Sequence, residues 1–161
     1  NVEKLELVSQ PIIVKPSPLD KKEKADMKRM SDVYQIYHPL ELCHKSGILS
    51  KSGLGNVQKQ VNKILKGMAL DFTEPKRSKS NFEKLKDAAW DHSLIQLDKE
   101  RSYKMAQFLG LGKENLKRDV RDKLKPICSV YTGQLDRYES IVDMAYREER
   151  KKTGVKKKRN F

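Results

Sequence analysis

Apolar residues three or four positions apart recur along most of this chain, which is the spacing of helices that bury one face. Between residues 20 and 37 these positions hold methionine, valine and tyrosine, while five basic residues lie at other positions. We predict a first helix there. We expect it to end at the pair His38-Pro39, because the residue before a proline disfavours helical dihedral angles.

The same spacing predicts four further helices. Residues 46–55 contain three glycines and three serines, which favours a loop, and Asn56 is expected to cap a second helix after it. A capping box of Ser80 and Glu83 predicts the start of a third helix that runs to about Leu109. A fourth helix is expected over residues 113–124 and a fifth over 129–152, with Pro126 between them. The apolar stripe of the fifth helix is predicted to comprise Leu135, Tyr138, Ile141, Val142 and Ala145.

These elements favour an all-α fold, a single-domain bundle of about five helices. Residues 1–19 contain three prolines and predict an extended N-terminal arm. Residues 20–152 then form the helical domain, and residues 153–161 a basic C-terminal tail. No apolar run approaches the roughly 20 residues that a membrane-spanning helix needs.

The charge of the chain indicates the class of its partner. It has 35 lysines and arginines against 22 acidic residues, a net charge of +13, which attracts polyanions over long range. Residues 147–159 alone hold eight basic and two acidic side chains, and the predicted fourth helix is also rich in basic residues. The predicted polyanion-binding residues are Lys113, Lys117, Arg118, Arg121, Arg147, Arg150, Lys151, Lys152, Lys156, Lys157, Lys158 and Arg159.

Residues capable of catalysis or metal binding are sparse. His38, Cys43 and His44 form the one local cluster, which is one ligand short of a tetrahedral zinc site. A cysteine nucleophile would also need an orienting group and an oxyanion site. The glycine-serine stretch 50–56 lacks the preceding strand and the spacing of a phosphate-binding loop. We therefore predict a protein that is not an enzyme and that uses no metal or other cofactor.

The two cysteines, Cys43 and Cys128, are far apart in the sequence and form no CxxC pair. They are either two buried thiols or, in a secreted protein, one disulfide. The first residue is Asn1, and the sequence leaves open whether it follows a cleaved signal peptide.

One segment near the C-terminus resembles a known family. Residues 126–146 contain a proline, a Tyr-Thr pair and a closing Asp-Met-Ala-Tyr. The matching residues are Pro126, Tyr131, Thr132, Asp143, Met144, Ala145 and Tyr146, with conservative matches at Ile127 and Val142. This segment, 21 of the 161 residues, resembles the gastropod (abalone) sperm lysin and eighteen-kilodalton acrosomal protein family. In lysin a long tail follows the matched segment, whereas here the segment lies near the C-terminus.

The resemblance implies a secreted protein of the sperm acrosomal vesicle. Such a protein would bind an acidic egg-envelope glycoprotein or an anionic membrane and disrupt it without enzymatic activity. The composition leaves an alternative open, an intracellular ribonucleoprotein component that binds the phosphates of RNA or DNA. The sequence also leaves a homodimer open.

Overall fold

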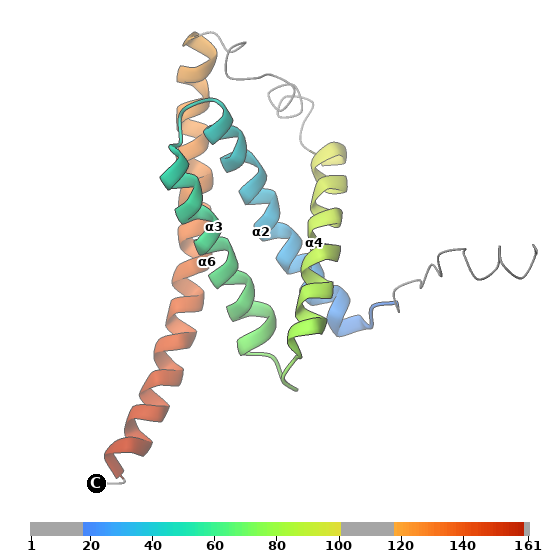
Figure 1. The fold of residues 1–161 in the computed structure, drawn as a ribbon, viewed down its shortest axis with the longest axis vertical. Coiled ribbons are helices and arrows are strands. Elements are labelled where there is room, and N and C mark those ends of the chain that lie inside the picture. The colour runs from blue at the N-terminus through green and yellow to red at the C-terminus, as the bar shows by residue number, and fades with distance from the viewer. Residues whose placement is uncertain (1–17, 101–117, 160–161) are drawn as a thin grey trace, which may run out of the picture.

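The computed structural model describes residues 18–100 and 118–159, but not the side chains of residues 97–100, 118–120 and 154–159. The described part contains four long helices: α2 (Lys21–Lys45), α3 (Lys51–Lys66), α4 (Lys79–Glu100) and α6 (Arg118–Arg159). A short π-helical segment, η1 (Gly67–Asp71), follows α3 directly. No strand occurs in these two ranges, and the predicted all-α class is confirmed for them (Figure 1). The predicted N-terminal arm lies almost wholly outside the described residues.

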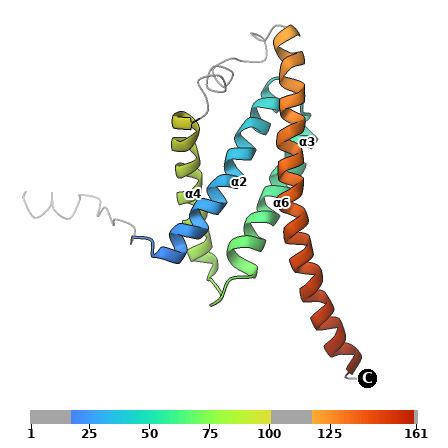
Figure 2. The ribbon, with the colours of Figure 1, turned by 180° about the vertical axis from the view of Figure 1, so that it is seen from behind.

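Helix α2 is the centre of the bundle. Helices α4 and α6 lie on opposite sides of it, and α3 packs against both α2 and α6 (Figures 1 and 2). The core lies where these four helices meet and is largely aliphatic. Its most deeply buried side chains include Met30, Val33, Leu40, Ile64, Leu65, Leu85, Leu124 and Leu135. Three of the four helices therefore depend on α2 for the burial of their apolar faces.

Helix α2 begins with a capping box and ends later than predicted. The Asp20 side chain accepts a hydrogen bond from the Glu23 backbone N–H at 2.8 Å, and Glu23 accepts one from the Asp20 N–H at 3.1 Å. The predicted end at His38-Pro39 is wrong, since the helix continues to Lys45. Pro39 and the leucines on either side of Glu41 are buried, and this burial compensates for the backbone hydrogen bond that the proline removes. The chain turns at Gly47, which has a positive φ of 80°.

The starts of α3 and α4 also differ from prediction. Helix α3 begins at Lys51, and the Ser50 hydroxyl accepts a hydrogen bond from the Gly53 N–H at 3.0 Å. Asn56 is therefore not the cap, and the predicted loop of residues 46–55 is shortened to its first half. At α4 the Ser78 hydroxyl accepts from the Asn81 N–H at 3.2 Å, so Ser78 takes the role predicted for Ser80. Residues 101–109, the predicted end of this helix, lie outside the described residues.

The predicted fourth and fifth helices are one helix. Helix α6 runs through Pro126 without interruption and continues to Arg159, past the predicted boundary at residue 153. Pro126 is exposed, so water can solvate the carbonyl group that loses its helical partner. Leu124 and Cys128, on either side of the proline, are both buried on one face. The continuity of this face explains why the proline does not divide the helix.

A disulfide joins α2 to α6. The sulfur atoms of Cys43 and Cys128 are 2.08 Å apart and the Cα atoms 6.2 Å apart. Both side chains are buried. The bond links residues separated by 85 positions, and closing a loop of that length stabilises the folded state by about 4 kcal/mol through the entropy of the unfolded chain. Of the two states left open by the sequence, the structure has the disulfide.

A buried ion pair holds the linker between η1 and α4. The Arg77 Nη2 atom lies 2.8 Å from Asp26 Oδ2, and the two side chains are 7% and 5% exposed. The two atoms form an ion pair, but their angles do not meet the geometry of a hydrogen bond. Arg77 also donates through Nη1 to the Ala69 carbonyl at 2.7 Å. The arginine thus ties the end of η1 and the linker to the first half of α2.

Candidate polyanion-binding surface

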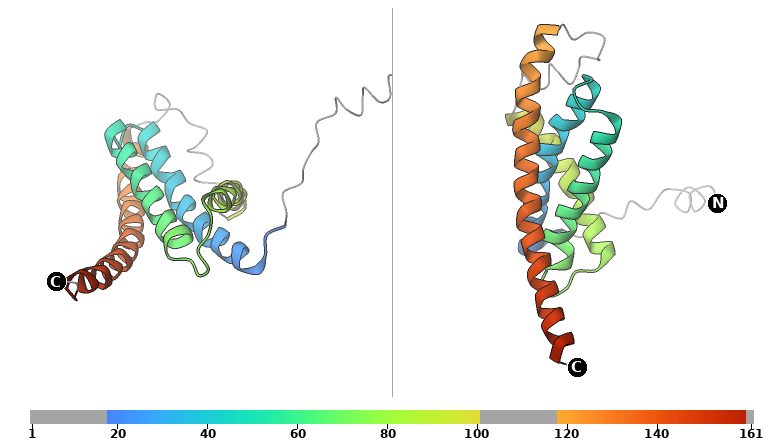
Figure 3. Two further views of the ribbon diagram at one scale, coloured as in Figure 1. Left: turned by 60° about the horizontal axis from the view of Figure 1, so that its bottom comes forward. Right: turned by 90° about the vertical axis from the view of Figure 1, so that its left-hand side faces the viewer.

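Four of the predicted polyanion-binding residues lie together on the part of α6 that extends beyond the bundle. Arg147, Arg150, Lys151 and Lys152 are all exposed. We call these four residues the α6 basic end. Tyr146, immediately before them, is still held by the bundle: its hydroxyl donates to Asp71 at 2.5 Å and its ring lies 4.8 Å from that of Phe72. The C-terminal end of α6 projects away from the other helices (Figure 3).

The side chains of most of the remaining predicted polyanion-binding residues are not described. Lys156, Lys157, Lys158 and Arg159 belong to the same helix, but their side chains are not described, and the same holds for Arg118. Lys113 and Lys117 lie outside the described residues. Arg121 is half-buried, and its Nε donates to the Ser46 carbonyl at 3.1 Å. Arg121 therefore anchors the start of α6 to the turn after α2. The α6 basic end lies near the other end of the same helix.

Three acidic residues in the middle of α6 face α3, while Glu148 and Glu149 are exposed between Arg147 and Arg150. Lys63 of α3 lies 2.5 Å from the Asp143 carboxylate and 3.6 Å from that of Glu139. These contacts, with the hydrogen bond to Asp143 first, raise the pKa of Lys63 above its usual value. Gln60 donates to Asp136 at 2.7 Å. The acids in the middle of α6 are thus engaged by α3, and they lie upstream of the α6 basic end. Sequence reasoning missed this pairing.

The residues of the local histidine-cysteine cluster have separate partners. Cys43 is in the disulfide. His38 is buried, its Nε2 lies 2.8 Å from the Ser93 hydroxyl, and its ring packs edge-on against Trp90 at 4.6 Å. His44 Nδ1 lies 3.0 Å from the Leu49 carbonyl oxygen. Burial lowers the pKa of His38. Within residues 18–100 and 118–159, no three His, Cys, Asp or Glu side chains are grouped so as to hold a metal ion.

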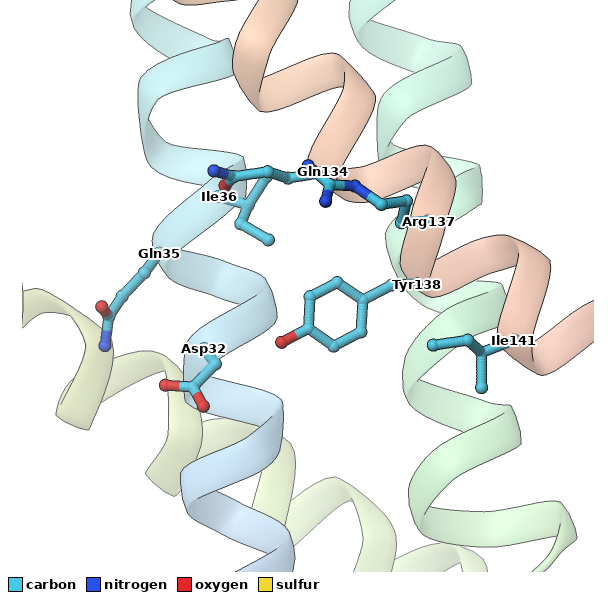
Figure 4. Close-up of a pocket in the computed structure, with 7 residues that line it drawn as sticks. All are labelled: Asp32, Gln35, Ile36, Gln134, Arg137, Tyr138 and Ile141. Carbon is cyan, nitrogen blue, oxygen red and sulfur yellow. The ribbon is translucent and has the colours of Figure 1, made fainter.

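A groove between α2 and α6 was not predicted. Asp32, Gln35 and Ile36 line it from α2, and Gln134, Arg137, Tyr138 and Ile141 line it from α6 (Figure 4). The groove is open to solvent and has a volume of about 390 Å³, and a second open groove of about 440 Å³ adjoins it at Tyr138 and Ile141. Ile141 was predicted to belong to the apolar core stripe, but its side chain is 66% exposed. Leu135 and Val142 are buried as predicted.

None of the helices in the described part of the chain is both long enough and apolar enough to cross a membrane. No protein family model, curated protein or solved structure matches this chain.

Proposed function

We propose that this protein binds an acidic surface through the α6 basic end and acts without catalysing a reaction. The observation that carries the proposal is the position of four exposed basic side chains on a helix that projects from the bundle. A projecting helix can approach an extended polyanion without a clash from the rest of the molecule. The sequence adds four more basic residues between 156 and 159, which would lengthen the contact.

We propose further that the partner is an extracellular acidic glycoprotein or an anionic membrane, as in a lysin-like acrosomal protein. Two observations support this. Disulfides persist in secreted proteins and are rare in reducing compartments, and Cys43 and Cys128 form one. The segment that resembles the lysin family, residues 126–146, lies entirely on α6 directly before the α6 basic end. Long-range attraction would bring the helix to an acidic egg envelope, where binding would compete with the contacts that hold the envelope together.

The experiment compares three probes with the full, disulfide-bonded chain at several salt concentrations. The probes are a sialylated mucin glycoprotein, single-stranded RNA, and vesicles that contain phosphatidylserine. We expect the glycoprotein or the vesicles to bind more tightly than the RNA. Tighter binding of RNA at every salt concentration would overturn the extracellular assignment and favour the nucleic-acid alternative.

A charge-matched pair of variants tests the site itself. In the first, Arg147, Arg150, Lys151 and Lys152 are replaced by Gln. In the second, four exposed lysines outside α6, Lys21, Lys24, Lys28 and Lys51, are replaced by Gln. Both lower the net charge from +13 to +9. We expect the first variant to lose affinity for the glycoprotein by about tenfold or more and the second to lose much less, because only the first removes contacts with the polyanion. Equal losses would mean that net charge alone decides binding.

A further inference from the structure

Helix α6 carries a second apolar stripe, apart from the one that faces the core. Ile127, Val130, Ile141 and Met144 are 38%, 57%, 66% and 60% exposed. The buried stripe consists of other residues, Leu124, Cys128, Leu135 and Val142. An isolated exposed apolar side chain is common on protein surfaces, but a row of them along one helix indicates an interaction surface.

The spacing of the second stripe is that of a helix-helix seam. Gln134 and Arg137 occupy the two positions between the apolar pairs, so that the six residues are separated alternately by three and four positions. This is the a and d pattern by which one helix packs along another. We call the six residues the α6 seam. At 1.5 Å per residue the seam is about 25 Å long.

The α6 seam is self-complementary in an antiparallel arrangement. When a second copy of α6 lies antiparallel beside the first, Ile127 faces Met144, Val130 faces Ile141, and Gln134 faces Arg137. Each apolar residue meets an apolar residue, and the central amide oxygen can accept a hydrogen bond from the guanidinium group. Two-fold symmetry repeats every pair, as a symmetric dimer requires. A polar pair at the centre of an apolar seam also fixes its register.

The groove between α2 and α6 provides room and charge for the second copy. Gln134, Arg137 and Ile141 of the seam line the groove directly. Figure 4 shows the Tyr138 ring pointing from α6 towards α2, with its hydroxyl turned to Asp32. Asp32 is exposed on the opposite wall, and its charge contributes to raising the pKa of Tyr138 after the larger effect of burial. This carboxylate supplies a counter-charge for the Arg137 of an incoming copy.

We propose that the protein forms a two-fold symmetric dimer in which the α6 seams of two chains pack antiparallel along the grooves between α2 and α6. The occupant is a second copy because the order of residues in the seam is self-complementary. Two chains of charge +13 repel each other, so screening by salt strengthens the dimer. Polyanion binding responds to salt in the opposite direction, and the two activities can therefore be measured separately.

Sedimentation analysis tests the dimer. From about 1 µM to about 1 mM, where weak to moderate interfaces associate, the weight-average mass should rise from 18.7 kDa towards twice that value, and more readily at high salt. The variant Ile141→Asp should remain monomeric. Its matched control is Ser140→Asp, which adds the same charge at an exposed neighbouring position outside the seam and should dimerise as the natural chain does. A natural chain that stays monomeric throughout, or an Ile141→Asp variant that dimerises like its control, would overturn the proposal.

Engineered cysteines test the register. Val130→Cys and Ile141→Cys are prepared as separate proteins, each with its Cys43–Cys128 disulfide intact and buried. On mild oxidation we expect a cross-link at least five times faster in the mixture of the two than in either protein alone, because Val130 faces Ile141 of the other chain. A faster cross-link of Val130→Cys with itself would indicate a parallel seam and contradict the proposal. Neither result bears on glycoprotein binding by the α6 basic end, which is assayed on the same proteins.

Discussion

At the scale of single residues, two buried polar groups decide how the helices around α2 are held. Asp26 and His38 both lie on α2, and each is bound to a residue from another part of the chain. The sequence identified His38 only as a member of an incomplete ligand cluster, because the position of Ser93 opposite it depends on the packing of α4. The Asp26–Arg77 pair was not predicted, since the two residues are far apart in the sequence and meet only in the folded structure.

The Asp26–Arg77 pair makes a prediction about stability. Arg77→Ala removes the buried partner of the Asp26 carboxylate and leaves only the exposed Arg29 beside it, and we expect the free energy of unfolding to fall by about 3 kcal/mol. Arg29 is a matched control: it contacts the same carboxylate at 2.5 Å but is 59% exposed, so Arg29→Ala should cost at most about 1 kcal/mol. Urea unfolding of both variants measures the difference. Similar losses from the two would contradict the importance of burial.

His38 makes a prediction about pH. Burial lowers its pKa in the folded state below the ordinary value of 6.5, so as pH falls the unfolded chain takes up a proton first. The stability associated with neutral His38 is therefore complete above about pH 6.5 and is lost progressively below it, down to the folded-state pKa. His38→Gln cannot titrate, and we expect it to lose less stability than the natural chain between pH 7.5 and pH 5. Parallel urea denaturation curves at the two pH values test this, and equal losses would show that His38 does not contribute.

At the scale of elements, the apolar spacing predicted where helices occur better than where they end. The stripes over residues 20–37 and 129–152 correspond to parts of α2 and α6. The predicted breaks at Pro39 and Pro126 are wrong because the chain buries apolar residues on both sides of each proline. Local propensity is a weak signal when burial opposes it. The second stripe on α6 is present in the sequence as alternating spacings of three and four, but distinguishing it from the core stripe requires knowing which face meets α2 and α3.

The approach of η1 to α6 makes a prediction about packing. A Cβ atom added to Gly67 would lie 2.4 Å from Cγ1 of Val142, which is too close, so Gly67→Ala should destabilise the protein by about 1 to 3 kcal/mol. Gly55 in α3 has no atom within 4 Å of the same position, and Gly55→Ala should stabilise by about 0.5 to 1 kcal/mol through helix propensity. Thermal unfolding of the two variants gives the signs. A neutral or stabilising Gly67→Ala would contradict the close contact.

At the scale of the whole molecule, a disulfide joins two helices of the bundle and basic residues cluster at the C-terminal end of α6. The disulfide holds the first half of α6 against the end of α2, while the last part of α6 projects with the α6 basic end. The sequence predicted the basic cluster directly, since it is local. It left the state of the cysteines open, because pairing over 85 residues depends on the tertiary fold.

The disulfide makes a prediction about the stability of the whole bundle. Replacing both Cys43 and Cys128 with alanine should lower the free energy of unfolding by about 4 kcal/mol, mainly because the unfolded chain gains freedom. Urea denaturation under non-reducing conditions measures this change. The natural chain in reducing buffer should show a similar loss once the bond has opened. A change of less than about 1 kcal/mol in both experiments would mean that the cross-link constrains the unfolded chain little.

The salt dependence of glycoprotein binding tests the central proposal most directly. For the natural chain, the logarithm of the binding constant for the sialylated mucin should fall linearly with the logarithm of salt concentration, because contacts with a polyanion release bound counterions. The variant with Gln at the four positions of the α6 basic end should give a much shallower slope. The variant with Gln at Lys21, Lys24, Lys28 and Lys51 should keep the natural slope. Equal slopes for the two variants would contradict the assignment of the α6 basic end as the binding surface.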